Sequence, residues 1–210
     1  MSNRHAPPAK RSTRNQPQRR IVRLLTEGRR TEVEYFAKLA ALYRDRVTVD
    51  FEPLHGTPMT LVDRAVTLVE QRQRTMRRGR GDTPFDEIWC IFDRDEHPFV
   101  EAAIALAELH EIGVAFSNPC FELWLVLHVT DLRRHTERHA VQAMSTALGF
   151  TIGKGLARET WPTLESRWEM AETRSLALDA MHEGNDSPVG SNPSTSVALV
   201  VRILQRDSPS

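Results

Sequence analysis

The stretch Trp89–His97, which reads WCIFDRDEH, places an apolar segment directly before a group of acidic residues. Residues that favour the interior of a β-sheet lead into two aspartates one position apart, Asp93 and Asp95. An aspartate after a strand often does no more than form a turn with its own backbone. A run of four polar, mostly acidic groups is more than such a turn needs. The stretch therefore predicts a buried strand that delivers acids to a binding site.

Strand and helix patterns alternate four times over the first two thirds of the chain. The predicted strands cover residues 21–28, 47–54, 85–93 and 113–117. The predicted helices cover 31–45, 60–78, 98–112 and 118–128. Thr31 and Glu34 have the spacing of a capping box, and Asn118 with Pro119 is placed to cap and open the fourth helix. The alternation predicts an α/β fold with a mostly parallel sheet flanked by helices.

The remainder of the chain shows only helical patterns, near residues 136–148, 161–182 and 194–206. Three regions are therefore predicted. Residues 1–19 form a flexible basic tail, residues 20–130 the α/β core, and residues 131–210 a helical C-terminal part packed on the core.

The formal charge is balanced, with 28 basic and 28 acidic residues, but the charges are separated along the chain. The first twenty residues hold six basic side chains and no acid, and a second basic run lies between Arg72 and Arg80. Two cysteines offer no disulfide framework, and no segment resembles a membrane span or a signal peptide. These features predict a cytoplasmic protein with no membrane partner. The basic segments favour contact with the backbone of a nucleic acid over a merely solubilising role.

Acidic residues follow the predicted strands at the edge where parallel strands present their carboxyl ends. Glu27 follows the first strand, Asp93 and Asp95 the third, and Glu122 lies one turn into the helix after the fourth. Ligands bind at this edge of open parallel sheets. Carboxylates that meet there repel each other unless protons or cations intervene, and Mg²⁺ prefers such oxygen ligands. The pattern predicts a site for Mg²⁺ (or Mn²⁺). Alternatively, the aspartates form turns and Glu27 interacts with neighbouring arginines on the surface.

Four segments of the sequence resemble the RloB family of bacterial proteins, which is associated with phage defence and restriction loci. These segments are TEGRRTEVEYF, WCIFDRDEH, SNPCFELWLVLH and NPSTSVALVVRIL, and the resemblance runs from about Ile21 to Leu204. The first segments are also similar to the Toprim domain of topoisomerases and primases. That domain has a glutamate after its first strand, a DxD pair after its third, and magnesium between them. Glu27, Asp93 and Asp95 match these positions, whereas the SNPCFELW segment and the C-terminal half depart from the Toprim pattern.

The resemblance implies a Mg²⁺-dependent phosphodiesterase or nuclease that acts on DNA or RNA in anti-phage defence. In this scheme Asp93 and Asp95 hold the metal, Glu27 completes the shell through water or acts as general base or acid, and Glu122 is a fourth carboxylate. The alternative is a non-catalytic metal- and nucleic-acid-binding subunit of a defence complex. Nucleotidyl transfer is a weaker third hypothesis, because the sequence has no GxxxxGK[ST] loop. A companion ATPase and a homo-oligomer are the partner hypotheses besides nucleic acid.

Several further residues are candidates for supporting roles, each with a structural alternative. The candidates for phosphate or nucleic-acid contact are Asn118, Lys154, Arg94, Arg77 and Arg78. His97 is a candidate for an outer contact to the metal ligands. The alternatives are a helix cap for Asn118 and solvated surface positions for the charged residues and the histidine.

Deletion of residues 1–19 is expected to weaken binding to nucleic acid and to reduce its dependence on salt, because cationic side chains release counterions from phosphates. Filter binding or fluorescence anisotropy at several salt concentrations measures both effects. An unchanged slope of affinity against salt would show that the tail makes no phosphate contacts.

Overall fold

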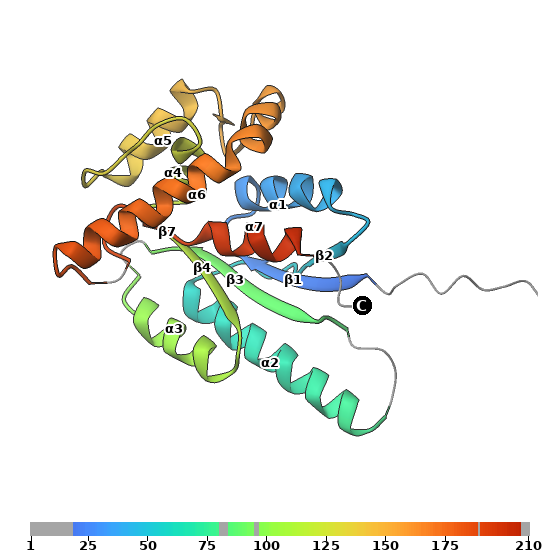
Figure 1. Cartoon of the computed structure of the whole chain (residues 1–210). Coiled ribbons are helices and arrows are strands. Elements are labelled where there is room, and N and C mark those ends of the chain that lie inside the picture. The colour runs from blue at the N-terminus through green and yellow to red at the C-terminus, as the bar shows by residue number, and fades with distance from the viewer. Residues whose placement is uncertain (1–18, 80–83, 95–96, 189, 207–210) are drawn as a thin grey trace, which may run out of the picture.

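The computed structural model describes residues 19–79, 84–94, 97–188 and 190–206. Its main feature is a five-stranded sheet with the order β2-β1-β3-β4-β7 (Figure 1). The strands are β1 (Arg20–Thr26), β2 (Val47–Phe51), β3 (Glu87–Asp93), β4 (Gly113–Asn118) and β7 (Ser194–Thr195). The first four are parallel to their neighbours, and β7 pairs antiparallel with β4. The predicted α/β class with a mostly parallel sheet is confirmed.

Helices cover both faces of this sheet. Figure 1 shows α2 (Pro58–Arg77) and α3 (Val100–Leu109) on one face, and α1 (Thr31–Leu42) and α7 (Val197–Gln205) on the other. The helices α4 (Glu122–Leu127), α5 (Arg138–Ala147) and α6 (Trp161–Gly184) form a group beyond α1 and α7. A short 3₁₀ helix (Arg158–Thr160) leads into α6.

The central strands carry apolar side chains towards both faces of the sheet, because both faces are covered by helices. In β3, Cys90 and Phe92 belong to the core beneath α2 and α3, whereas Ile91 belongs to the core on the α1 side. The side chains of β1 divide in the same way, with Leu24 in one core and Leu25 in the other. This two-sided burial fixes the direction of β3 and so delivers its final residue, Asp93, to the edge of the sheet.

The prediction that the chain beyond His128 is helical only is wrong. A two-stranded hairpin is present, formed by β5 (Thr151–Ile152) and β6 (Gly155–Leu156), and β7 joins the main sheet. These strands have two residues each, too few to produce an alternating pattern. The strand β7 depends on a distant partner, because its Thr195 hydroxyl hydrogen-bonds to the Ser117 hydroxyl of β4 at 2.8 Å.

Both predicted N-terminal caps are also wrong. Thr31 is the first residue of α1 rather than its cap, and its hydroxyl donates to the carbonyl of Lys154 at 3.0 Å. Asn118 ends β4, and its side-chain amide donates to the carbonyl of Gly190 at 2.8 Å, while α4 begins only at Glu122. In both cases a tertiary hydrogen bond has taken the side chain that a local cap would use.

The predicted basic tail, residues 1–19, lies outside the described residues except for Arg19, and the basic run continues into Arg20. Arg20 opens β1, is buried, and forms an ion pair with Glu87 at 3.2 Å. Arg20 therefore belongs to the core rather than to a cationic tail. Within the described part of the chain, no helix is both long enough and apolar enough to cross a membrane.

We expect Gly113→Ala to destabilise the protein, because a β-carbon there would lie 2.3 Å from the indole ring of Trp89. Overpacking of this kind costs about 1–3 kcal/mol. Urea unfolding measures the effect, and Gly184→Ala is the matched control because a β-carbon at Gly184 meets no atom within 4 Å. The control should leave stability unchanged or raise it by up to about 1 kcal/mol. Equal stability of the two variants would contradict the close packing of Trp89 on β4.

Candidate functional site

Glu27 and Asp93 meet at the carboxyl end of the sheet, as the sequence predicts. In the parallel pairing of β1 with β3, Thr26 lies opposite Ile91, and the N–H of Glu27 continues the ladder by donating to the Ile91 carbonyl at 2.9 Å. The Glu27 carboxylate then accepts the N–H of Asp93 at 3.1 Å. Its other oxygen lies 3.2 Å from Nε2 of His97. Glu27 is thus held on both oxygens, and one of its partners is His97.

Asp93 is buried, and both of its carboxylate oxygens have partners. Oδ1 accepts the backbone N–H of Phe121 at 2.9 Å, immediately before α4. Oδ2 forms an ion pair with the guanidinium of Arg138, in the first turn of α5. Burial and the neighbouring Glu32 carboxylate raise the pKa of Asp93 well above its usual value, and Arg138 opposes this shift. The helical C-terminal part therefore supplies a cation directly to a predicted metal ligand.

A buried carboxylate that the sequence reasoning missed, that of Glu32, lies beside this pair. Glu32 is in the first turn of α1 and is only 7% exposed. Its carboxylate accepts the N–H of Gly28 at 3.1 Å and fills the space above that glycine, where a β-carbon would lie 2.0 Å from it. Burial, together with the negative charges of Glu122 and Glu27, raises the pKa of Glu32 to about 7. Four carboxylates therefore influence one another at this end of the sheet.

A cleft of about 670 Å³ opens next to these carboxylates. Asp93, Glu32 and Glu122 line it. Cationic and polar residues from the loop before α1, from α5 and from the β5–β6 hairpin complete the lining. The basic residues that line it are Arg29, Arg30, Arg138, His139 and Lys154. The cleft therefore combines oxygen ligands suited to a cation with positive groups suited to a phosphate.

The β5–β6 hairpin brings Lys154 to this cleft. The Lys154 carbonyl accepts the Thr31 hydroxyl, and the N–H of Leu156 donates to Glu34 at 2.7 Å. The hairpin also comes close to α1 at Gly155, where a β-carbon would lie 2.9 Å from the end of the Arg30 side chain. The structure thus places the predicted phosphate-binding lysine at the same cleft as Glu32 and Asp93.

Other predicted phosphate contacts lie elsewhere. Asn118 is half-buried and is held by the Gly190 carbonyl. Arg94 forms an ion pair with Glu101 of α3 at 2.7 Å and lies over the ring of Phe116, so it is directed away from the carboxylates. Asp95 lies outside the described residues. Among the described residues next to Asp93 in the sequence, Arg94 pairs with Glu101 and His97 contacts Glu27.

Arg77 and Arg78 are exposed at the far end of α2. His55, just before α2, hydrogen-bonds to the carbonyl of Thr26 at 2.9 Å, so α2 begins near the carboxylates and runs away from them. A helix of 20 residues is about 30 Å long. A nucleic acid that contacted both Glu27 and Arg77 would therefore have to extend over about that distance.

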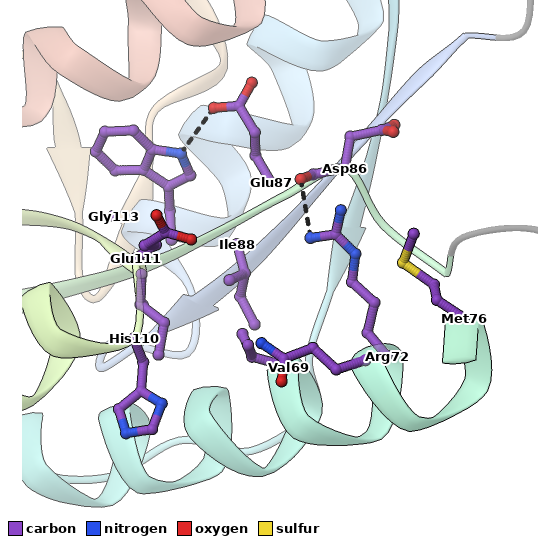
Figure 2. Close-up of a pocket in the computed structure, with 12 residues that line it drawn as sticks. Val69, Arg72, Met76, Asp86, Glu87, Ile88, His110, Glu111 and Gly113 are labelled. Carbon is purple, nitrogen blue, oxygen red and sulfur yellow. Dashed lines mark hydrogen bonds between the residues drawn. The ribbon is translucent and has the colours of Figure 1, made fainter. Parts of the chain in front are cut away.

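A second cavity, of about 490 Å³, lies at the amino ends of β3 and β4, opposite the carboxylate site. Figure 2 shows that two of its polar groups interact within the protein. Trp89 donates to Glu87 at 3.4 Å, and Arg72 donates to the carbonyl of Asp86 at 3.3 Å. Charged residues also line this cavity, but it lies at the opposite edge of the sheet from Glu27 and Asp93.

The described residues do not by themselves provide a full set of ligands for the predicted Mg²⁺ site. Among residues 19–79, 84–94, 97–188 and 190–206, no three His, Cys, Asp or Glu side chains are arranged to hold one metal ion. Mg²⁺ needs only one or two carboxylates when water and substrate oxygens complete its shell. Glu27 and Asp93, with further carboxylates close by, fit that requirement in chemistry and position.

The fold and the site together describe an α/β protein with carboxylates at the carboxyl edge of a parallel sheet. A family model described as RloB-like protein matches residues 22–204 of the chain. The chain therefore belongs to the RloB-like family. Comparison with curated proteins and with solved structures gives no significant match.

We expect Glu32→Gln to change how stability depends on pH. Because the pKa of Glu32 rises from 4.5 to about 7 on folding, the folded protein retains a proton between these values that the unfolded chain releases. Stability therefore falls as the pH rises through this window, by about 3 kcal/mol in total. Glutamine keeps an oxygen for the Gly28 N–H and does not ionise, so the variant should lack this loss.

Urea unfolding at pH 5 and pH 8 in EDTA measures the difference between the wild type and this variant. The variant should gain stability relative to the wild type as the pH rises. If the free energies of unfolding of the two proteins changed equally with pH, folding would not raise the pKa of Glu32.

Proposed function

We propose that this RloB-like protein is a Mg²⁺- or Mn²⁺-dependent phosphodiesterase that cleaves DNA or RNA. The observation that supports this most directly is the convergence of Glu27 and Asp93, joined by a 3.1 Å hydrogen bond, at the carboxyl ends of two adjacent parallel strands. A role in bacterial anti-phage defence is part of the proposal and rests on the resemblance to the RloB family.

Asp93 and Asp95 would hold the divalent ion, with Glu27 contributing through water. When bound, such an ion polarises a scissile phosphate and lowers the pKa of a bound water. His97 keeps the Glu27 carboxylate in place through its 3.2 Å contact. Glu27 is then the residue best placed to take a proton from an attacking water or to return one to the leaving oxygen.

The cationic lining of the cleft supports a polyanionic substrate. Arg29 and Arg30 are exposed at the start of α1, and Lys154 is exposed on the hairpin opposite. Their attraction to phosphates is independent of base sequence and decreases with added salt. They would hold the backbone of a nucleic acid next to a site that is otherwise negatively charged.

A second candidate function is that of a metal- and nucleic-acid-binding subunit without turnover. The observation that favours it is that both oxygens of Asp93 already have partners, Phe121 and Arg138. Such a protein could report nucleic acid to a companion ATPase. Incubation of labelled DNA and RNA with Mg²⁺, Mn²⁺ or EDTA, with and without the ATPase, separates the two functions, because only the enzyme yields products.

We expect Glu27→Gln and Asp93→Asn each to reduce Mg²⁺-dependent cleavage by about a hundredfold or more, the usual contribution of a proton-transferring group or metal ligand. Asparagine is preferred to alanine at Asp93 because its oxygen still accepts the Phe121 N–H. Gel assays of labelled oligonucleotides measure cleavage, and thermal unfolding verifies that the variants fold.

Asp131→Asn is a matched control, because Asp131 is an exposed acid whose partner is the surface residue Arg133. The control should cleave at the wild-type rate. Full activity in both site variants would remove Glu27 and Asp93 from the mechanism.

A further inference from the structure

We infer that Arg138 and the divalent cation compete for the carboxylate of Asp93, so that the guanidinium occupies the metal position until the ion displaces it. This inference rests on the proposed function, because it requires that the ion binds at Asp93. It assigns a positioning role to a residue of the C-terminal helical part, 45 positions away from its partner in the chain.

Competition follows from how the two oxygens of Asp93 are used. Oδ1 accepts the N–H of Phe121, a backbone group fixed just before α4. Oδ2 is the oxygen left for a cation, and Arg138 holds it. The Asp93 side chain is only 10% exposed. A Mg²⁺ ion at its required 2.0–2.1 Å from the same oxygen would repel the guanidinium strongly in such a poorly solvated place.

The surrounding carboxylates explain why a cation is needed before the ion arrives. Glu32 and Glu27 both act on Asp93 by charge repulsion, and a buried carboxylate without a partner is strongly destabilising. Arg138 provides the compensating charge. A site that lacked it would have to protonate or deform whenever the ion dissociated.

A displaced Arg138 would remain within reach of the substrate. Its side chain is 31% exposed and lines the cleft that Lys154 and Arg29 also line. A guanidinium binds phosphate through paired hydrogen bonds, as it binds carboxylate. The ion would therefore convert Arg138 from a partner of Asp93 into a ligand for the phosphate.

The test is a titration of the full-length protein with Mn²⁺, followed by electron paramagnetic resonance of the free ion. Arg138→Met keeps an unbranched apolar side chain and removes the competing charge, so Mn²⁺ affinity should rise about tenfold, equivalent to about 1.4 kcal/mol. Arg29→Met is the matched control, because it removes the same charge from the same cleft. The control should change the affinity by no more than about twofold.

Asp93→Asn separates failure of this inference from failure of the proposed function. If Asp93→Asn weakens Mn²⁺ binding at least tenfold but Arg138→Met does not strengthen it, competition is overturned and the metal site stands. If Asp93→Asn binds Mn²⁺ as the wild type does, the metal site itself is overturned, and the competition with it.

A measurement on the wild type covers the case in which Arg138→Met does not fold. Addition of diamagnetic Mg²⁺ should shift the Nε–H resonance of Arg138 in a ¹⁵N-correlated NMR spectrum, along with the amide resonance of Asp93. A shift of the Asp93 amide without any change at Arg138 would overturn the inference.

Discussion

Repulsion among carboxylates at the carboxyl ends of β1 and β3 is the constraint on which the architecture of this site depends. Glu27, Glu32 and Asp93 come from three segments, and burial together with the charge of Glu27 raises the pKa values of both Glu32 and Asp93. Such a cluster is stable only if positive groups are brought to it. In this protein those groups include backbone N–H donors and one guanidinium from the C-terminal part.

This constraint accounts for the way in which the C-terminal part packs on the core. The parallel pairing of β3 with β4 sets Asp93 opposite Ser117, so the chain leaving β4 passes close to the Asp93 carboxylate. The Phe121 N–H then reaches Oδ1, and α4 packs against α5, which presents Arg138 to Oδ2. The helical part is therefore joined to the sheet by charge as well as by apolar burial.

The fold was largely predictable from the sequence, because burial on both faces of a parallel sheet leaves continuous apolar runs separated by helical periods. Glu27 and Asp93 were predictable for the same reason, since parallel strands end at one edge. Glu32 was not recognised, because an acid in the first turn of a helix is common and carries no sign of burial. Arg138 left no signal at all, since only tertiary packing brings α5 to β3. The two-residue strands also depend on partners distant in the chain. So do the hydrogen bonds that occupy the side chains of Thr31 and Asn118 in place of helix caps.

The Arg138–Asp93 ion pair also bears on how a metal ion could reach Asp93 in either candidate function. A phosphodiesterase must release an oxygen of Asp93 in each metal-bound state, so its ion pair has to be weak enough for a divalent ion to break. A metal-binding subunit without turnover has the same need, whereas an ion pair that only held α5 on the sheet would be permanent. Arg138 is partly exposed and lines the cleft together with other cationic residues. Its guanidinium could therefore turn from Asp93 towards a phosphate bound in the cleft. Because a purely structural ion pair gains nothing from that arrangement, the geometry favours an exchangeable ion pair over a permanent one.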